Sequence, residues 1–394
     1  MKSVKLGEIG KIITGCTPST KKSEYYADNK YMFVGPSDIK KVMYVVSSEK
    51  NISEKAFEDY KNRFIEENSI VVDCIGSDMG NVAIVKCRCL TNQQINAITN
   101  IDEECYNIKY IYYVLSTMKK YFHLIGTNGS TMPILNKTMF ENIEVEIPKI
   151  EIQNKISKIL SKLDDKIKLN NEINNNLHDL AEQQFNGIYL KGSPKKLGEL
   201  LVSISTGSRP KGGAQDCGVP SIGAEKIEKF GVYNYSSEKY ISEEYYEKLK
   251  NGKLNSGDVL LYKDGAYTGK VSMCLNDFPH KKAAVNEHVF ILNTKNNWAQ
   301  NYLYFALYNK DNKEMIHRLA CSKAAQPGLN QIELKSVEVN ICAEKEIINF
   351  ENSVKPIMKK ISSNALENKK LVELRDTLLP KLMNGEIDLD NIEI

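Results

Sequence analysis

Polar and basic side chains gather in four short segments of this chain, and each segment occurs twice in the same order. They are rich in the residues that hydrogen-bond phosphates and base edges, and their glycines let backbone amides approach a phosphate. Any single surface loop is polar, but four that recur in order predict a shared binding face for nucleic acid. The paired segments are 14–22 and 206–213, 76–81 and 263–270, 91–94 and 281–288, and 126–131 and 322–326.

Within these loops, the polar and basic side chains are the candidate nucleic-acid contacts. The two copies differ in detail, as Lys270 against Asn81 and Arg209 against Thr17 show, so they would read two different sequences. The first copy offers Thr17, Ser19, Lys21, Lys22, Ser77, Asn81, Asn92, Gln93, Gln94, Asn128, Ser130 and Thr131. The second copy offers Ser208, Arg209, Lys211, Lys263, Tyr267, Thr268, Lys270, Lys281, Lys282, Asn286, Ser322, Lys323 and Gln326.

Catalytic signatures are missing from the sequence. There is no glycine-rich dinucleotide loop after a strand, no phosphate-binding Gly-x-x-x-x-Gly-Lys-Ser/Thr, and no Asp/Asn-Pro-Pro-Tyr/Phe of the kind that grips a target amine. Asp258 with Lys263 and Asp264 could imitate a nuclease site, but such patterns arise freely when 26% of residues are charged. We therefore expect no catalytic residue in this chain.

Metal-binding signatures are equally weak. Cys87 and Cys89 would point the same way on a strand and Cys74 could join them, but no fourth ligand follows at zinc spacing. Ordinary buried or half-buried thiols are the favoured interpretation. His178 falls in a helical segment, where a surface or helix-contact position is expected. We predict no metal and no cofactor bound by this chain.

The elements that position the loops are duplicated as well. The sequence Lys5-Leu6-Gly7-Glu8-Ile9 returns as Lys196-Leu197-Gly198-Glu199-Leu200, and later matches keep their order with an offset between about 188 and about 194 residues. Such a period is too long for a solenoid and indicates two similar domains. Further matched pairs are 34–39 with 222–227, 76–82 with 265–271, 110–115 with 302–307, and 133–136 with 327–330.

Each copy is expected to be a mixed α/β (α+β) globular domain followed by a long helix. Apolar runs at 69–75 and 257–262 predict strands, the second after a turn at 255–258, while 110–120 and 301–309 predict helices. The expected domains are 1–150, a central helix 151–190, 191–343, and a C-terminal helix and tail 344–394.

The two long segments repeat apolar residues at spacings of three and four, which is typical of a helix burying a narrow stripe against another helix. We expect them to pair antiparallel like a coiled coil, giving a pseudo-twofold arrangement, with Asn170 fixing register. Gly187 and Gly385 are the expected ends, and Pro356 predicts a kink or a late start. Two unrelated helices, each packed on its own domain, are the alternative. The expected stripes are Ile152, Ile156, Ile159, Leu163, Ile167, Ile173, Leu177 and Leu180, and Ile347, Phe350, Val354, Ile357, Ile361, Leu371, Leu374, Leu378 and Leu382.

Composition sets the outer limits. The 394 residues carry a net charge of only +3, from 53 basic and 50 acidic residues, so a polyanion surface would need local clustering. Nine scattered cysteines argue against a disulfide framework and for a reducing cytoplasm. No stretch approaches a membrane span, and residues 1–8 lack the apolar core of a signal peptide.

The chain resembles the DNA-specificity (S) subunit of type I restriction-modification enzymes. The resemblance covers nearly the whole chain and rests on the two domain starts, the run Gly-Asp-Val-Leu-Leu-Tyr-Lys-Asp-Gly-Ala at 257–266, and the tail Leu-Arg-Asp-Thr-Leu-Leu-Pro-Lys-Leu-Met-Asn-Gly-Glu-Ile at 374–387. Family helices often open after a Pro-rich turn; here the first follows Pro148, whereas the second, at Glu344, lacks a proline.

This resemblance implies two target-recognition domains, each reading one half of a split sequence in double-stranded DNA, and two long helices that set the gap. It also implies two methyltransferase subunits as partners, with restriction subunits in a full complex. The S-adenosylmethionine that methylates adenine would be bound by the methyltransferase subunits. A two-domain scaffold that binds no DNA, and a self-contained methyltransferase, are the competing interpretations.

Overall fold

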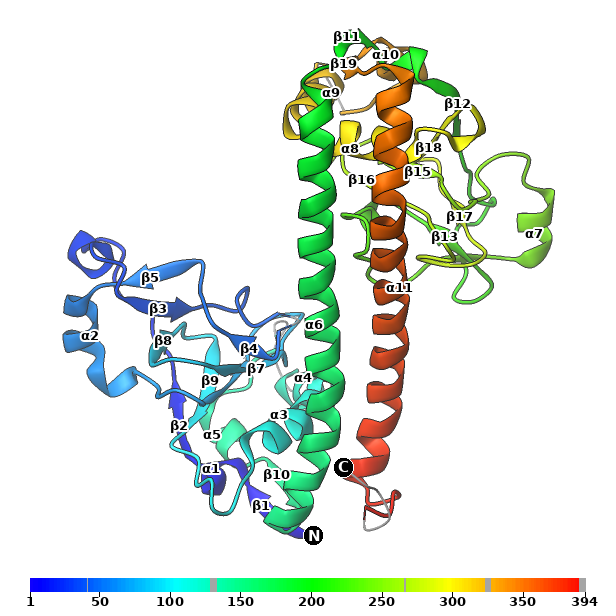
Figure 1. Ribbon diagram of the computed structural model, residues 1–394. Helices are drawn as coiled ribbons and strands as arrows, with labels where there is room; N and C mark the ends of the chain where they lie inside the picture. The colour runs from blue at the N-terminus through cyan, green and yellow to red at the C-terminus, as the bar shows by residue number, and fades with distance from the viewer. Residues whose placement is uncertain (41, 128–132, 266, 323–326, 390–394) are drawn as a thin grey trace. The chain divides into compact units, whose positions relative to one another are not determined.

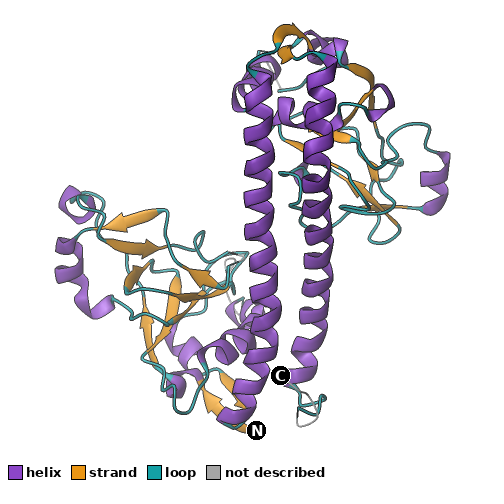
Figure 2. Cartoon of the chain, viewed as in Figure 1, coloured by secondary structure: helices purple, strands orange, loops and turns teal. Residues whose placement is uncertain are grey.

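The computed structural model describes residues 1–394 except 41, 128–132, 266, 323–326 and 390–394 (Figure 1). The chain divides into two compact units, Met1–Asp164 with Leu374–Ile394, and Asp165–Glu373. Each unit has mixed helix and strand content (Figure 2). Each therefore includes a part of both long helices, and the predicted domain limits at 150, 190 and 343 stay a prediction.

The first unit is built on three small sheets. They are β1–β10, the five-stranded β2-β9-β6-β7-β4, and β5-β3-β8, in which β3 and β8 are parallel. The strands are β1 Lys2–Lys5, β2 Lys11–Thr14, β3 Tyr31–Val34, β4 Tyr44–Val45, β5 Lys50–Ile52, β6 Ile70–Asp73, β7 Val82–Val85, β8 Cys89–Thr91, β9 Ile95–Thr99 and β10 Glu144–Ile147. The short helices are α1 Leu6–Ile9, α2 Glu54–Tyr60, α3 Ile108–Thr117, α4 Lys119–Gly126 and α5 Lys137–Glu141.

The second unit repeats this strand order, except that its described strands include no counterpart of β4. Its sheets are β11–β19, β12-β18-β15-β16, and β14-β13-β17, in which β13 and β17 are parallel. The strands are β11 Ser193–Lys196, β12 Leu201–Thr206, β13 Val219–Ile222, β14 Tyr240–Ile241, β15 Val259–Tyr262, β16 Val271–Met273, β17 Ala284–Val285, β18 Val289–Thr294 and β19 Glu338–Ile341. The helices are α7 Glu243–Lys248, α8 Gln300–Tyr308, α9 Lys310–Cys321 and α10 Gln331–Ser336. The duplication in the sequence is thus a duplication of topology.

The predicted strands at 69–75 and 257–262 are confirmed as β6 and β15, and both are buried on both faces. In β6, Ile70 and Val72 enter one apolar cluster and Val71 another; in β15, Leu260 likewise separates from its neighbours. Burial on both faces explains why these strands read as continuous apolar runs rather than alternating ones.

The two long helices are α6, Ile150–Tyr189, and α11, Glu344–Met383. The end at Gly385 is confirmed: its φ is 71°, and the amide of Glu386 donates to the Lys381 carbonyl at 2.9 Å. The stop at Gly187 is wrong, because α6 continues to Tyr189, whose ring is buried in the core of the second unit.

The expected late start at Pro356 is also wrong, because α11 begins at Glu344. Ile347, Phe350 and Val354 bury the preceding turns in the core of the second unit, which offsets the hydrogen bond that proline removes. The predicted apolar stripes are partly wrong, since Ile152, Leu180 and Leu374 are exposed by 41%, 45% and 46%.

Within the second unit, buried asparagines of α6 hydrogen-bond α11. Asn170, 1% exposed, donates to Glu367 and Asn368 at 2.9 Å. One turn later, Asn174 donates to the Ile361 carbonyl at 3.2 Å and accepts from Asn364 at 2.9 Å. In the first unit, Arg375 of α11 donates to Asp164 of α6 at 2.7 Å.

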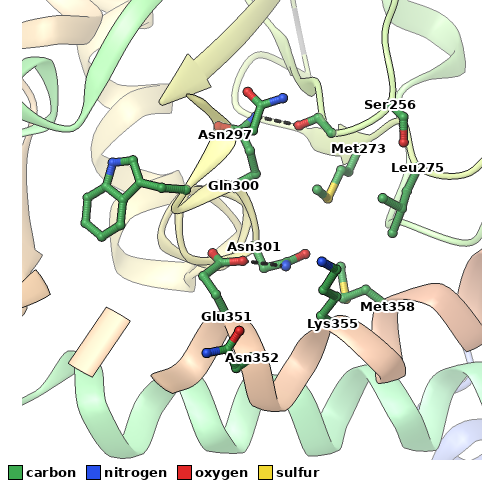
Figure 3. A pocket seen from close by; sticks show the side chains of 12 residues that line it. Ser256, Met273, Leu275, Asn297, Gln300, Asn301, Glu351, Asn352, Lys355 and Met358 are labelled. Carbon is green, nitrogen blue, oxygen red and sulfur yellow. Dashed lines mark hydrogen bonds between the residues drawn. The ribbon is translucent and has the colours of Figure 1, made fainter. Parts of the chain in front are cut away.

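A second polar junction of this unit joins α8 to α11. Figure 3 shows Glu351 hydrogen-bonded to Asn301 beside a cavity of about 410 Å³ that Lys355 and Met358 also line. The Glu351 carboxylate accepts from Asn301 Nδ2 at 2.6 Å and from the Tyr302 amide at 2.8 Å, at the N-terminus of α8. Burial nevertheless raises the pKa of Glu351 to about 7. The described residues include no helix long and apolar enough to cross a membrane.

Replacing Asn174 by alanine should lower the free energy of unfolding by about 1–3 kcal/mol, because the buried amide of Asn364 loses its acceptor. The double change Asn174→Leu with Asn364→Leu should recover most of this loss, since no polar group is then left unpaired. Urea unfolding measures both. Asn176→Ala, at an exposed position of the same helix, is the control. Equal losses for Asn174→Ala and this control would contradict the role of the buried pair.

Replacing Glu351 by glutamine should flatten the dependence of stability on pH. With its pKa raised from 4.5 to about 7, the folded protein binds a proton more strongly than the unfolded chain. Stability therefore falls as pH rises from 4.5 to 7, by on the order of 3 kcal/mol in total. Unfolding of the variant at pH 5 and pH 8 should show a smaller difference than wild type. Glu344→Gln, exposed on the same helix, should keep the wild-type difference.

Candidate nucleic-acid interface

Backbone hydrogen bonds bring the candidate loops of the first unit together. The Cys16 amide donates to the Thr91 carbonyl at 2.9 Å, which joins the first loop to the third. The Cys74 amide donates to Gln94 at 2.7 Å, and the Gly76 amide to Pro133, directly after the fourth loop, at 3.1 Å. The loops predicted from the sequence are therefore neighbours in space.

Equivalent bonds occur in the second unit. The Lys263 amide donates to the His288 carbonyl at 3.1 Å, and the Gly265 amide to Pro327 at 3.0 Å. Gly207 in the first loop lies so close to the Val285 carbonyl that a Cβ atom there would clash with it. Because these contacts use backbone atoms and a glycine, the same arrangement of loop backbones is compatible with different side chains in the two copies.

The second loop forms the tip of a hairpin in each unit, between β6 and β7 and between β15 and β16. Two glycines with positive φ frame it each time: Gly76 at 109° and Gly80 at 94°, then Gly265 at 113° and Gly269 at 99°. Side-chain-bearing residues rarely adopt this backbone conformation, so the glycine pair specifies the turn. The residues between the glycines are free to differ.

In the first unit, this hairpin tip holds a network of charges and amides. The buried Asp73 carboxylate accepts from the amide and the side chain of Asn81 at 2.7 and 2.8 Å, while burial raises the pKa of Asp73. Lys119 of α4 donates to Asp78 at 2.7 Å and to Asn81 at 2.9 Å. Hydrogen bonds from Lys119 and Lys40 lower the pKa of Asp78 to about 2. Asp78 thus pairs with both lysines at this tip.

In the second unit, each lysine of the tip is paired with a carboxylate. Lys263 pairs with Asp264 at 2.6 Å, and Lys270 pairs with Glu228 at 2.5 Å. Tyr267 is 63% exposed, and the Lys270 ammonium lies 4.9 Å from the centre of its ring. This combination of a cation and an open aromatic face suits a nucleic-acid backbone or base.

Some candidate residues build the loops rather than reach solvent. The side-chain oxygens of Asn92 and Asn286 accept from the amides two residues later, at 2.8 and 3.0 Å. Asn286 and Thr268 are 1% and 2% exposed, and Thr268 donates to the Gly265 carbonyl. Their place in the structure supports a positioning role.

The remaining candidates divide by exposure. Half-buried positions are Asn81, Asn92, Gln94, Arg209, Lys263 and Lys270. Exposed positions are Thr17, Ser19, Lys21, Lys22, Ser77, Gln93, Ser208, Lys211, Tyr267, Lys281, Lys282 and Ser322. Asn128, Ser130, Thr131, Lys323 and Gln326 lie outside the described residues.

Several exposed candidates already have partners in the protein. Thr17 contacts Gln93, Ser208 lies 2.9 Å from the Tyr245 hydroxyl, and Lys282 pairs with Glu243 and Glu247. Surface pairs of this kind contribute little stability, so a phosphate can compete for these groups.

The sequence-based selection missed a set of basic side chains on α9. Lys310, Lys313, His317 and Arg318 line a cavity of about 480 Å³ together with Tyr267 and Lys270 of the hairpin tip. Their spacing of three, four and one residues places them on one side of a helix, and that spacing was the available signal.

One group of side chains in the described part of the chain could hold a metal ion: His178, Asp179 and Glu182 of α6. His178 is buried, which corrects the surface position considered above, and its Nε2 lies 2.9 Å from the Tyr304 hydroxyl. Burial lowers the pKa of His178 to about 3, so the ring is neutral and its Nδ1 lies 3.8 Å from Glu182.

The cysteines are all free thiols. Cys89 is buried in β8 and Cys74 is buried, whereas Cys87 precedes the strand and is exposed. The expectation that Cys87 and Cys89 share one face of a strand is therefore wrong, because the strand begins only at Cys89.

Comparison with known proteins finds relatives that match nearly the whole chain or a part of it. Residues 1–179 match the family described as type I restriction modification DNA specificity domain. The chain is 26% identical over 416 residues to the type I restriction enzyme MjaIX specificity subunit of Methanocaldococcus jannaschii, covering 98% of this chain and 94% of that protein. It is 30% identical over 161 residues to the HindI specificity subunit of Haemophilus influenzae, covering 40% and 35% of the two chains.

A solved structure has the same fold. The S subunit of a type I restriction-modification system from M. genitalium aligns with a TM-score of 0.60 and 15% identity, over 97% of this chain and 95% of that one. The family resemblance predicted from the domain starts and the tail is confirmed: residues 1–179 match the DNA specificity domain of type I restriction-modification enzymes, and the chain is similar over nearly its whole length to a specificity subunit.

Proposed function

We propose that this chain is the DNA-reading subunit of a type I methyltransferase, in which each domain recognises one half of a split sequence. The observation that carries the proposal is the repeated loop cluster. The bonds Cys74–Gln94 and Lys263–His288 hold equivalent loops in place, yet the exposed side chains on them differ. One frame with two sets of side chains fits the reading of two unlike half-sites.

The chemistry of the exposed loop residues fits duplex DNA. Lysines and hydroxyl groups contact phosphates, and amide side chains such as Gln93 match the edge of adenine in the major groove. The backbone amides near the paired glycines can also approach a phosphate closely. Exposed candidates would read or bind DNA, and Asn92, Asn286 and Thr268 would shape the loops.

The long helices are proposed to pair antiparallel, like a coiled coil, and to relate the two domains by a pseudo-twofold axis. In support, the α11 partner number falls as the α6 number rises: Asn170 meets Asn368, Asn174 meets Asn364, and Gln184 meets Ser353. Half-sites on one face of B-DNA are separated by a helical turn of about 34 Å or its multiples. A helix of about 40 residues spans about 60 Å, which is long enough to set such a gap.

The same helices are proposed to dock two methyltransferase subunits. Leu169 and Leu180 of α6 are 50% and 45% exposed, which suits apolar contact with partner helices. S-adenosylmethionine would be held by those partners, and this chain would be non-catalytic. The target adenine would leave the base stack to reach the partner's active site. Restriction subunits would complete the nuclease form of the complex.

Two alternatives give different results in simple assays. A scaffold that does not bind DNA would show no salt-dependent affinity for duplexes, even with methyltransferase subunits present. A self-contained methyltransferase would transfer labelled methyl groups from S-adenosylmethionine to DNA as the isolated chain. We expect transfer only after the partner subunits are added.

Exchanging residues 1–150 for the corresponding domain of another specificity subunit should change one half of the methylated sequence and leave the other half intact. Sequencing of methylated adenines in a host that carries the hybrid with its methyltransferase reports both halves and the gap. Exchange of residues 191–343 is the matched control and should change the opposite half. A change in both halves from either exchange would contradict independent reading.

Inserting seven residues into both helices, after Glu172 and at the matching level of α11 after Asn364, should lengthen the gap. Seven helical residues add about 10 Å, or about three base pairs. The methylated sequence should keep both halves with the larger gap, or methylation should be lost. A seven-residue insertion between Glu103 and Glu104, in an exposed turn outside the four candidate loops, is the control. An unchanged gap after the helix insertion would contradict the spacer role.

A further inference from the structure

We propose that a basic groove in the second domain binds the sugar-phosphate backbone of DNA. The equivalent position of the first domain contributes less to the salt-dependent affinity than this groove does. The groove lies between the hairpin tip at 267–270 and α9, and we call it the α9 groove. It is lined by Tyr267, Lys270, Lys310, Lys313, His317 and Arg318. This inference rests on the proposed function and adds residues outside the four predicted loops.

Direct contacts hold the α9 groove against the loop cluster. His317 of α9 lies with its Nδ1 3.2 Å from the Thr268 carbonyl, and Gly269 packs against the backbone and stem of Lys313. The Thr268 hydroxyl closes the turn by donating to the Gly265 carbonyl at 2.7 Å. These contacts fix the helix against the hairpin, so the cations keep a defined place beside the reading loops.

Its charge is available to a ligand. In the described part of the chain, Lys310, Lys313 and Arg318 form no ion pair, and all three are exposed. Glu314 is the carboxylate that lines the groove with them, and Asp311 lies on the same helix. Lys270 already pairs with Glu228, so the unpaired charge comes mainly from α9.

The spacing of these cations fits a strand of DNA. From Lys310 to Arg318, the helix rises about 12 Å, and successive phosphates of one strand rise about 3.4 Å. The row therefore spans about three phosphates. Tyr267 adds an exposed ring at the mouth, where its hydroxyl can reach a phosphate and its face can cover a sugar.

The equivalent place in the first domain is neutralised. Gly80 packs against Lys119, the first residue of α4, and Gly269 packs against Lys313, in the first turn of α9, so the two lysines occupy similar places beside the hairpin tip. Lys119, however, donates to Asp78 at 2.7 Å and to Asn81 at 2.9 Å, and Asp78 also holds Lys40 at 2.9 Å. A phosphate would have to displace a carboxylate there, whereas Lys313 is open to it.

The test measures affinity against salt for the assembled methyltransferase complex. The probes are a duplex that carries the sequence methylated by the wild-type complex and a scrambled duplex of equal length. Changing Lys313→Ala together with Arg318→Ala should reduce the slope of log K against log salt by about 2, since each phosphate contact contributes about 0.9. Affinity should fall by the same factor on both duplexes, because phosphate contacts carry no sequence information.

Two control variants and a second double variant accompany this test. Lys119→Ala, the matched change in the first domain, should alter the slope by less than 0.5, roughly half of one phosphate contact. Lys313→Arg should keep the wild-type slope, and Lys310→Ala with Arg318→Ala provides a second double variant. Circular dichroism and complex assembly verify folding of each.

The outcomes distinguish failure of the groove proposal from failure of the proposed function. An unchanged slope in both double variants overturns the groove, and an equal loss for Lys119→Ala overturns the asymmetry between the domains. A change in sequence preference, with unchanged slope, would assign the residues to base reading instead. If the wild-type complex itself shows no salt-dependent DNA binding, the proposed function fails rather than this inference alone.

Discussion

Backbone hydrogen bonds between loops are the constraint on which both candidate reading surfaces depend. The Gly76 amide must bond the Pro133 carbonyl, and the Gly265 amide the Pro327 carbonyl, for the second and fourth loops to meet. Such bonds place no demand on side-chain identity, apart from glycines where a Cβ would clash or φ is positive. A protein built this way can change what it recognises by changing exposed side chains, while its fold stays the same.

The polar contacts between the long helices, in contrast, depend on side-chain identity, because side-chain hydrogen bonds determine the register of the two helices. Asn170, Asn174 and Asn364 are buried. Asn170 donates to the side chains of Glu367 and Asn368, while Asn174 accepts from Asn364 and donates to the Ile361 carbonyl. A sliding of one helix along the other would leave these amides unpaired, which costs more than a shift between purely apolar surfaces. The apolar residues give attraction, and the asparagines give register.

Much of the fold could be predicted from the chain, because the signals were local or repeated. The strands at β6 and β15 and the helix end at Gly385 rest on short-range patterns, and the duplication rests on motifs that recur in order. Sequence patterns were wrong where packing in the core decides the outcome. They predicted a stop at Gly187, a late start at Pro356 and a buried position for Leu374.

The candidate site was predictable only in outline. Repetition identified the loops, but the burial of Asn286 depends on contacts that are distant in sequence. The cations of α9 were missed for a related reason. They lie on a regular helix, and only the fold brings Lys313 beside Gly269.

The division of the chain into units has a consequence for its synthesis. The first unit needs Leu382, near the end of the chain, to complete a core that otherwise consists of residues from the first 160. Residues 165–373 are made in between, which takes about 10 to 40 s at about 5–20 residues per second. During that time the apolar side chains that Leu382 packs against in the finished core lack this contact. Because residues of α11 enter the cores of both units, neither core is complete before this helix has been synthesised.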